Sequence, residues 1–193
     1  MDTTLALPTA SDLRGWTLTQ FIGDGATAIV YRVDPPTYGK PASSTTTPLS
    51  ATTMVMKIVP FYRSSRTTKP FKGVQERFAI ESHMATWSGS IGMGPRVIAS
   101  WTTPRFGFIV MEEWDMTLTQ WKRRNAMSLP ENTMETVRKL IKRAKRAGHC
   151  DIKDANIVLR TAPHDDGSIM QVGIIDWGKV SVKPRILKYA IAS

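Results

Sequence analysis

Two short runs of the chain carry side chains whose chemistry suits phosphoryl transfer. They read His-Cys-Asp-Ile-Lys-Asp-Ala-Asn and Ile-Asp-Trp-Gly, and they contain Asp151, Lys153, Asn156 and Asp176. The carboxylate of Asp151 can receive a hydroxyl proton, and the ammonium of Lys153 can neutralise a moving phosphoryl group. The amide oxygen of Asn156 and the carboxylate of Asp176 are hard ligands that suit Mg²⁺ bound to phosphates. The set predicts phosphoryl transfer to a hydroxyl.

The elements around these runs indicate an α+β fold, with strands dominating before residue 112 and helices after it. Apolar and β-branched runs predict strands over residues 16–22, 28–33, 53–61, 97–102, 106–111, 157–159 and 170–175. Apolar residues at helical spacing predict helices over residues 75–87, 118–124 and 131–146. The stretch 35–53 is rich in Pro, Ser and Thr, and we expect it to form a surface loop.

Two features of the strand-rich half suit phosphate binding. Gly23 and Gly25 lie between two predicted strands, the second of which contains Val30, and glycines there would let backbone N–H groups approach phosphate oxygens. A structural hairpin turn would explain the same glycines. Lys57 lies in the apolar run Val-Met-Lys-Ile-Val, where its ammonium needs an anionic partner or, on an edge strand, a route to solvent.

The order of these motifs resembles that of the protein kinase superfamily. The glycine run is similar to the G-x-G-x-x-G-x-V loop, with Ala28 in place of the third glycine. The run from His149 to Asn156 is similar to H-R-D-L-x-x-x-N, and the run that begins at Ile175 is similar to the D-F-G block. Lys153, two residues after the aspartate, is typical of serine/threonine protein kinases.

This resemblance implies a two-lobed kinase-like fold. An N-lobe with an antiparallel sheet and one helix would span residues 14–111, after a flexible leader over residues 1–13. An abbreviated helical C-lobe would span residues 112–193. ATP and Mg²⁺ would bind in the cleft between the lobes.

The resemblance also assigns roles to the candidate residues. Asp151 would act as the base, and Lys153 would stabilise the transferring group. Asn156 and Asp176 would ligate Mg²⁺, and His149 would organise the backbone around them.

On the N-lobe side, the backbone at Gly23 and Gly25 and the side chain of Val30 would cover the nucleotide. Lys57 would bind its phosphates and pair with Glu81, with Glu76 as the alternative partner. Near the adenine, Met111 would set the depth of the pocket, Glu112 and Trp114 would offer backbone groups, and Asp115 would reach the ribose.

Three departures from the family pattern are present. Cys150 replaces the arginine that reads a phosphorylated activation loop, and the interval from Asn156 to Asp176 is longer than usual. Only fifteen residues follow Gly178, and no A-P-E segment is found. The chain therefore resembles a minimal kinase of the viral or bacterial-effector sort, or a fragment, and we expect no regulation by loop phosphorylation.

Two other functions fit the same residues. A pseudokinase would keep the nucleotide site but use the basic surface to dock a host or partner protein. A small-molecule phosphotransferase, similar to aminoglycoside or choline kinases, is favoured by Trp177, because those enzymes often carry I-D-W. The protein kinase is the expected function.

Composition restricts location and partners. No apolar run is long enough to span a bilayer, the first residues lack a basic signal region, and the single cysteine suits a reducing compartment. We expect a soluble protein of the cytoplasm or nucleus. Its expected substrate is a protein, and a host protein is one candidate. The net charge of +10, from 26 basic and 16 acidic residues, would attract ATP, acidic proteins, nucleic acid or anionic lipid alike, so an acidic partner for the C-lobe surface is one of several. A solvated basic face that aids solubility explains the same charge. Few aromatic residues accompany the cations, so nucleic-acid binding has no support beyond charge.

Overall fold

The computed structural model of the 193-residue chain describes residues 7–25, 27–37, 53–62, 73–125, 129–162 and 168–181. The chain divides into two compact units. The first consists of Met1–Gln75 and Ile98–Glu113, and the second of Glu76–Val97 and Trp114–Ser193. The α+β class predicted from the sequence is confirmed.

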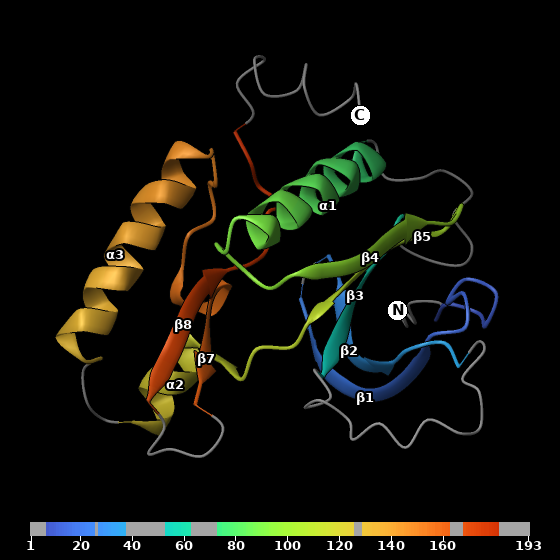
Figure 1. Cartoon of the computed structure of the whole chain (residues 1–193). Coiled ribbons are helices and arrows are strands. Elements are labelled where there is room, and N and C mark those ends of the chain that lie inside the picture. The colour runs from blue at the N-terminus through green and yellow to red at the C-terminus, as the bar shows by residue number, and fades with distance from the viewer. Residues whose placement is uncertain are drawn as a thin grey trace, which may run out of the picture. The chain divides into compact units, whose positions relative to one another are not determined.

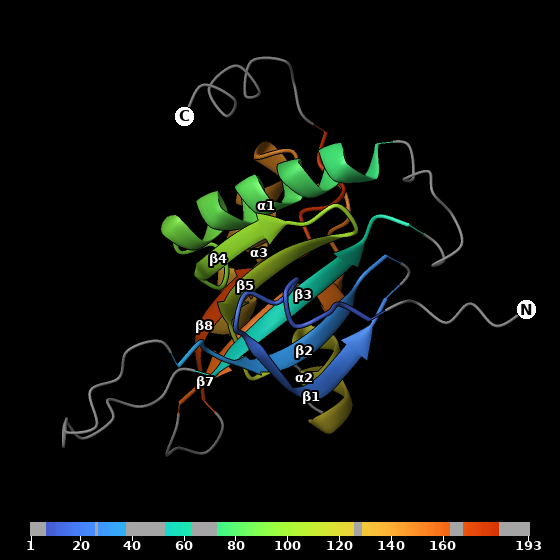
Figure 2. The same cartoon turned by 90° about the vertical axis from the view of Figure 1, so that its right-hand side faces the viewer.

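The first unit contains a five-stranded sheet with the order β1-β2-β3-β5-β4 (Figures 1 and 2). Its strands are β1 (Thr17–Asp24), β2 (Ile29–Asp34), β3 (Met54–Pro60), β4 (Val97–Thr102) and β5 (Phe106–Glu112). The pairs β1–β2, β2–β3 and β3–β5 are antiparallel. β3 is therefore a central strand, which excludes the edge-strand explanation of Lys57.

The core of the first unit covers one face of this sheet. Met56 and Phe108 are fully buried there, and the rings of Phe108 and Trp101 stack at 4.9 Å. The indole nitrogen Nε1 of Trp101 donates to the backbone oxygen of Asp12, and Leu13 packs against the same core. Residues 7–13, expected to be part of a loose leader, thus include a segment that is fixed to the core.

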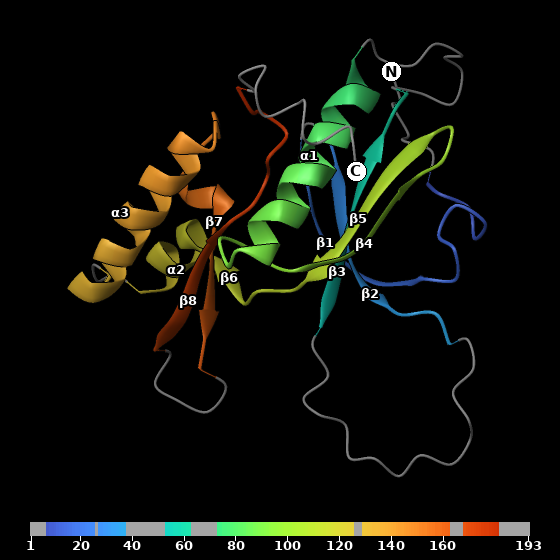
Figure 3. The ribbon, with the colours of Figure 1, turned by 45° about the horizontal axis from the view of Figure 1, so that its top comes forward.

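The second unit combines three helices with a small sheet of the order β6-β7-β8 (Figure 3). Its elements are α1 (Val74–Ser90), β6 (Met116–Thr117), α2 (Leu118–Arg124), α3 (Glu131–Arg146), the 3₁₀ turn η1 (Asp154–Asn156), β7 (Ile157–Thr161) and β8 (Ile169–Ile174). A capping box begins α2, since Thr117 and Gln120 each bind the other's backbone N–H through the side chain. Most of α1 falls in this unit, whereas we expected the helix in the N-lobe.

Two apolar clusters hold the second unit together. Met84 of α1, Leu140 of α3 and Ile174 of β8 share the first with Trp177. Residues of α2, α3 and β7 form the second. The buried positions of α3 recur every three or four residues, so one stripe packs inward and the cations of the other face meet solvent.

Some predictions fall on residues that the structure does not describe. Most of the 35–53 stretch and the turn at Asp165-Asp166-Gly167 lie outside the described residues. Among the described residues, no helix combines the length and apolarity that crossing a bilayer would require.

Candidate functional site

The segment between α3 and β7 is organised around Asn156. Its side-chain Nδ2 donates a 2.8 Å hydrogen bond to the backbone oxygen of Asp151, and its backbone N–H donates to the oxygen of Lys153. The side chain is buried, with 5% of the residue exposed. Its backbone oxygen accepts from the N–H of Ile175, the residue before Asp176. Asn156 thus connects both predicted catalytic runs.

His149 joins the same two runs from the other side. Its Nδ1 accepts a 3.2 Å hydrogen bond from the backbone N–H of Asp151, so the proton lies on Nε2, which donates to the oxygen of Ile175 at 3.1 Å. The ring is buried and lies 4.6 Å from that of Trp177. Burial lowers the pKa of His149 below its ordinary value of 6.5, although the bond to Ile175 acts in the opposite direction. A neutral imidazole therefore holds the backbone on both sides of the site.

Two ammonium groups contact the carboxylate of Asp151. Nζ of Lys153 lies 3.0 Å and Nζ of Lys179 lies 3.4 Å from Oδ2. The hydrogen bond from Lys153 is the largest cause that lowers the pKa of Asp151, and the charges of both lysines add to it. The carboxylate is therefore ionised at neutral pH. No donor from the described residues reaches its other oxygen, Oδ1.

Asp176 has a left-handed backbone conformation, with a φ of 63°. This conformation is costly for residues with a Cβ, and such strain concentrates at functional sites. A Cβ placed on Gly178 would lie 3.6 Å from Oδ1 of Asp176 and 3.2 Å from Oε2 of Glu81. The carboxylates of Asp176 and Glu81 therefore border the same side of Gly178.

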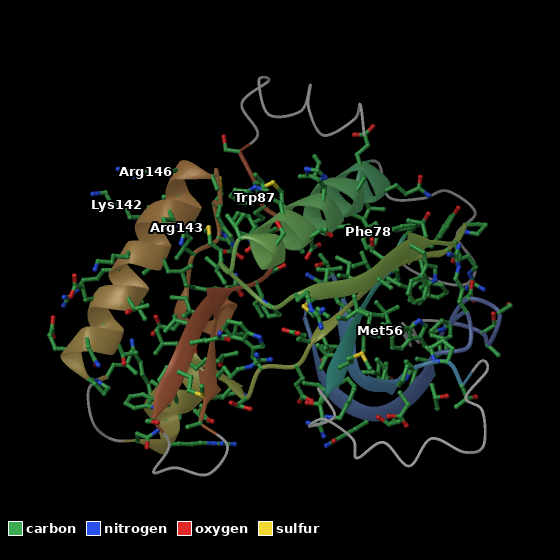
Figure 4. The ribbon with its side chains drawn as sticks, viewed as in Figure 1. Met56, Phe78, Trp87, Lys142, Arg143 and Arg146 are labelled. Carbon is green, nitrogen blue, oxygen red and sulfur yellow. The ribbon has the colours of Figure 1, made fainter. Side chains whose placement is uncertain are left out.

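The two glutamates considered as partners of Lys57 differ in burial. Glu81 is buried, with 7% exposed, whereas Glu76 is exposed in the first turn of α1. Met84, one turn after Glu81, is part of the core of the second unit, and Trp87 of the same helix packs against that core (Figure 4). The structure distinguishes Glu81 as the carboxylate near Asp176. Its pairing with Lys57, a residue of the other unit, stays a prediction.

In the first unit, three of the predicted nucleotide-binding residues lie in one row across the sheet. Gly23 of β1 pairs with Val30 of β2, Val30 pairs with Lys57 of β3, and Lys57 pairs with Ile109 of β5. Cross-strand partners share a face of the sheet, so Val30, Lys57 and Ile109 project to the same side. Met111, two residues after Ile109, follows on that side. The register thus gathers residues that are far apart in sequence.

The turn between β1 and β2 is closed by a 2.9 Å bond from the N–H of Gly25 to the oxygen of Ala28. A Cβ on Gly23 would meet no atom within 4 Å, and one on Gly25 would only touch the oxygen of Ala28 at 4.0 Å. Neither glycine has a positive φ. Local packing and backbone conformation therefore do not explain why glycine occupies these two positions.

The predicted adenine-binding residues lie at the end of β5 and in the segment that follows it. Glu112 ends β5, and its neighbour Glu113 is bound to Arg32. The ring of Trp114 packs against Gly173 and below the guanidinium of Arg160. Oδ2 of Asp115 accepts from the N–H and the hydroxyl of Thr161, and its expected role at the ribose stays a prediction.

Sequence analysis missed Lys179 as a site residue. Its backbone oxygen accepts from the N–H of Cys150 at 2.8 Å, and the N–H of Ser181 donates to the oxygen of Gly148. With the bridge between His149 and Val180, these bonds form a short antiparallel ladder. The ladder holds Lys179 beside Asp151. The lysine after D-W-G was the only signal in the sequence.

Asn156 and Asp176 offer the oxygen ligands that a magnesium ion takes. In the described part of the chain, no group of three or more His, Cys, Asp or Glu side chains could hold a metal ion. A divalent cation at Asn156 and Asp176 would take its other ligands from phosphate oxygens or water, as Mg²⁺ does in nucleotide sites.

The second unit thus brings together Asp151, Lys153, Asn156 and Asp176 with Glu81. The first unit brings together its own row of candidate residues on one face of the sheet. No family model matches the chain, and a comparison with curated proteins gave no match.

Proposed function

We propose that this chain is an ATP- and Mg²⁺-dependent phosphotransferase with a kinase-like two-lobed fold, which phosphorylates serine or threonine hydroxyls of a protein. The bond from Asn156 to the backbone of Asp151 carries this proposal. It fixes the amide oxygen of Asn156 relative to the carboxylate of Asp151, which is the arrangement that a metal ligand beside a base requires.

Asp151 acts on the acceptor hydroxyl. Its lowered pKa keeps it ionised, and Oδ1 is the oxygen that accepts a hydrogen bond from that hydroxyl. A carboxylate of low basicity orients the hydroxyl first and takes the proton late, which suits a loose transition state in which the acceptor is little deprotonated.

Lys153 and Lys179 neutralise the transferring group. Both ammonium groups lie at Oδ2 of Asp151, and both side chains are more than half exposed, so they can reach phosphate oxygens while remaining near the base. Lys179 thereby adds a second cation to the one expected from the sequence.

Asn156 and Asp176 would hold Mg²⁺ in this proposal. Their donor set, one amide and one carboxylate oxygen, fits that ion. When bound, Mg²⁺ would supply positive charge to the phosphate groups. The strained backbone of Asp176 supports its assignment as a functional residue.

The row of Gly23, Val30 and Lys57 supports nucleotide binding by the first unit. Lys57 lies on a central strand between Val30 and Ile109, and its ammonium would bind phosphate oxygens from there. The glycines, unexplained by packing, would allow backbone N–H groups to approach the phosphates.

The acceptor class decides between the three candidate functions. The purified chain would be incubated with γ-labelled ATP and Mg²⁺, in separate reactions with protein acceptors and with amino-alcohol or aminoglycoside acceptors. Label on serine or threonine supports the proposal. Label on the metabolites alone would identify a small-molecule phosphotransferase, and nucleotide binding without transfer would identify a pseudokinase.

A further inference from the structure

The second half of α3 carries cations whose side chains have no partner among the described residues. Earlier on the helix, Arg138 pairs with Glu131, and Lys139 pairs with Glu135. No acidic residue occurs between Glu135 and Asp151. Within the part of the chain that the structure describes, no side-chain hydrogen bond or ion pair involves the exposed cations that follow, Lys142, Arg143, Lys145 and Arg146. We call these four residues the basic end of α3.

The helix does not need these cations as caps. The carbonyl oxygens of Arg143, Ala144 and Lys145 accept from the backbone N–H groups of Ala147, His149 and Gly148, each at 3.0 Å. A basic residue in the last turn interacts favourably with the helix dipole, but this effect is small and limited to that turn. Like charges four residues apart on a helix repel one another, as Lys142 and Arg146 do, so interactions within the helix do not explain the basic end.

The basic end is rigidly connected to the site. His149 follows Lys145 and Arg146 closely in the chain, after Gly148. Its backbone N–H donates to the oxygen of Ala144 in the last turn of α3. The ladder between residues 148–150 and 179–181 then holds Lys179 beside Asp151. Figure 4 shows Lys142 and Arg146 extending outward from the same end of α3.

We propose that the basic end of α3 docks an acidic protein segment that carries the acceptor hydroxyl. This inference rests on the proposed function. Carboxylates of the segment would pair with the exposed cations, and the rigid connection would bring a serine or threonine of the segment toward Asp151 and Lys179. The protein is thus selective for hydroxyls with acidic neighbours.

The composition of α3 favours a protein partner over other polyanions. The helix has no aromatic residue on which bases could stack. Its exposed face has no apolar side chain that could insert into a lipid surface. An acidic peptide needs neither feature, because carboxylates pair with Lys and Arg directly.

Binding can be measured without phosphoryl transfer. The probe is a fluorescein-labelled peptide of Asp and Glu with one serine, compared with a peptide in which Asn and Gln replace the acidic residues. We expect the acidic peptide alone to bind in fluorescence anisotropy, with affinity falling as salt is raised. The double variant Lys142→Glu/Arg146→Glu should weaken binding roughly tenfold, as expected for two exposed ion pairs changed to repulsions.

The matched control is Arg123→Glu/Arg124→Glu on α2. Both of these residues are exposed, and the change in net charge is the same. We expect it to leave binding within about twofold of the unmodified chain. Equal weakening by both double variants, equal binding of the neutral peptide, or tighter binding of a single-stranded oligonucleotide of the same charge would overturn the inference. Should Lys142→Glu/Arg146→Glu fail to fold, Lys142→Gln/Arg146→Gln is measured in its place.

A phosphorylation assay with the same peptides separates this inference from the proposed function. We expect Lys142→Glu/Arg146→Glu to raise KM for the acidic peptide and leave kcat unchanged. Transfer to acidic and neutral peptides with the same KM would overturn the docking inference and leave the function intact. Selective binding without transfer to any acceptor would support docking and reject the function.

Discussion

The side-chain amide of Asn156 lies 2.8 Å from the backbone oxygen of Asp151 and donates a hydrogen bond to it. This bond closes the segment between them into a compact turn, in which the backbone of Lys153 is also bound. The turn keeps the amide oxygen of Asn156 and the carboxylate of Asp151 in a constant relationship. Since Asn156 is buried, replacing it disturbs both stability and the proposed chemistry.

Asn156→Asp tests this relationship with almost no change in shape. The variant loses the donor and places a carboxylate against the carbonyl of Asp151. We expect it to lower the free energy of unfolding by about 2 kcal/mol, as when a buried acceptor loses its donor. Phosphoryl transfer should fall roughly a hundredfold. Urea denaturation and an ATP-transfer assay measure the two effects.

Asn125→Asp is the control, because Nδ2 of Asn125 also donates to a backbone oxygen, that of Trp121, at 3.1 Å. That residue is exposed, so the same change should cost less than about 1 kcal/mol and leave transfer unaltered. A similar loss of transfer in both variants would contradict the role of Asn156.

The backbone at Asp176 gives a second prediction, because its φ of 63° favours glycine. Asp176→Gly and Asp176→Ala both remove the carboxylate, so both should abolish transfer. The glycine variant should nevertheless be more stable than the alanine variant by about 1 kcal/mol, because only alanine retains the strain. Denaturant titration of both proteins provides the comparison.

Asp154 provides the reference pair for this experiment. It lies in η1 and its φ is not positive, so Asp154→Ala should be more stable than Asp154→Gly, the usual order. If Asp176→Ala were likewise more stable than Asp176→Gly, the result would contradict the proposed strain in the backbone at Asp176.

His149 gives a prediction for pH. Burial lowers its pKa in the folded protein below 6.5, so the unfolded chain binds the proton more tightly. The stability that the neutral ring contributes is therefore complete above pH 6.5 and is lost as the pH falls through the folded pKa. We expect the unfolding free energy to decrease on acidification in this range more steeply for the unmodified chain than for His149→Asn, which cannot titrate.

His83→Asn is the matched control for His149, because His83 is exposed on α1. The stability profile of the His83→Asn variant controls for the loss of one histidine from the chain. Parallel profiles for His149→Asn and the unmodified chain would show that the ring at 149 is not held neutral.

The glycine turn gives a prediction about nucleotide affinity. A methyl group on Gly23 has open space, so Gly23→Ala should leave the melting temperature unchanged. It should weaken binding of Mg²⁺–ATP several-fold, because a Cβ obstructs the approach of phosphates to the backbone. Isothermal titration calorimetry measures the affinity.

Gly173→Ala is the comparison for the glycine turn. Its Cβ would lie 2.7 Å from the ring of Trp114, so this variant should lose stability for a packing reason. Unchanged ATP affinity in Gly23→Ala would leave the glycine as a simple turn residue and remove the phosphate-binding role.

Local signals in the sequence predicted most of the elements. The helices over 118–124 and 131–146 have the predicted bounds, because Thr117 with Gln120 and Pro130 begin them and Gly148 follows the second. The apolar run around Lys57 predicted a strand over residues 53–61, and β3 covers Met54–Pro60. Its central position in the sheet explains why so many of its neighbours are apolar.

Contacts between residues far apart in the chain could not be predicted from the sequence. Lys179 is one of several lysines and arginines late in the chain, and only the ladder with residues 148–150 places it beside Asp151. Likewise, the leader shows no strong pattern, yet the carbonyl of Asp12 binds the indole of Trp101, which lies far along the chain. Such contacts depend on tertiary geometry, which neither periodicity nor spacing reports.

The most direct test of the central claim is the initial rate of Mg²⁺-dependent γ-phosphoryl transfer in three proteins: the unmodified chain, Asp151→Asn and Asp154→Asn. The two variants change the same group within one short segment, but Asp154 pairs with Lys122 at the surface. We predict a loss of at least roughly a hundredfold for Asp151→Asn and unchanged transfer for Asp154→Asn. Equal rates in all three proteins, or no transfer above background by the unmodified chain, would contradict the account.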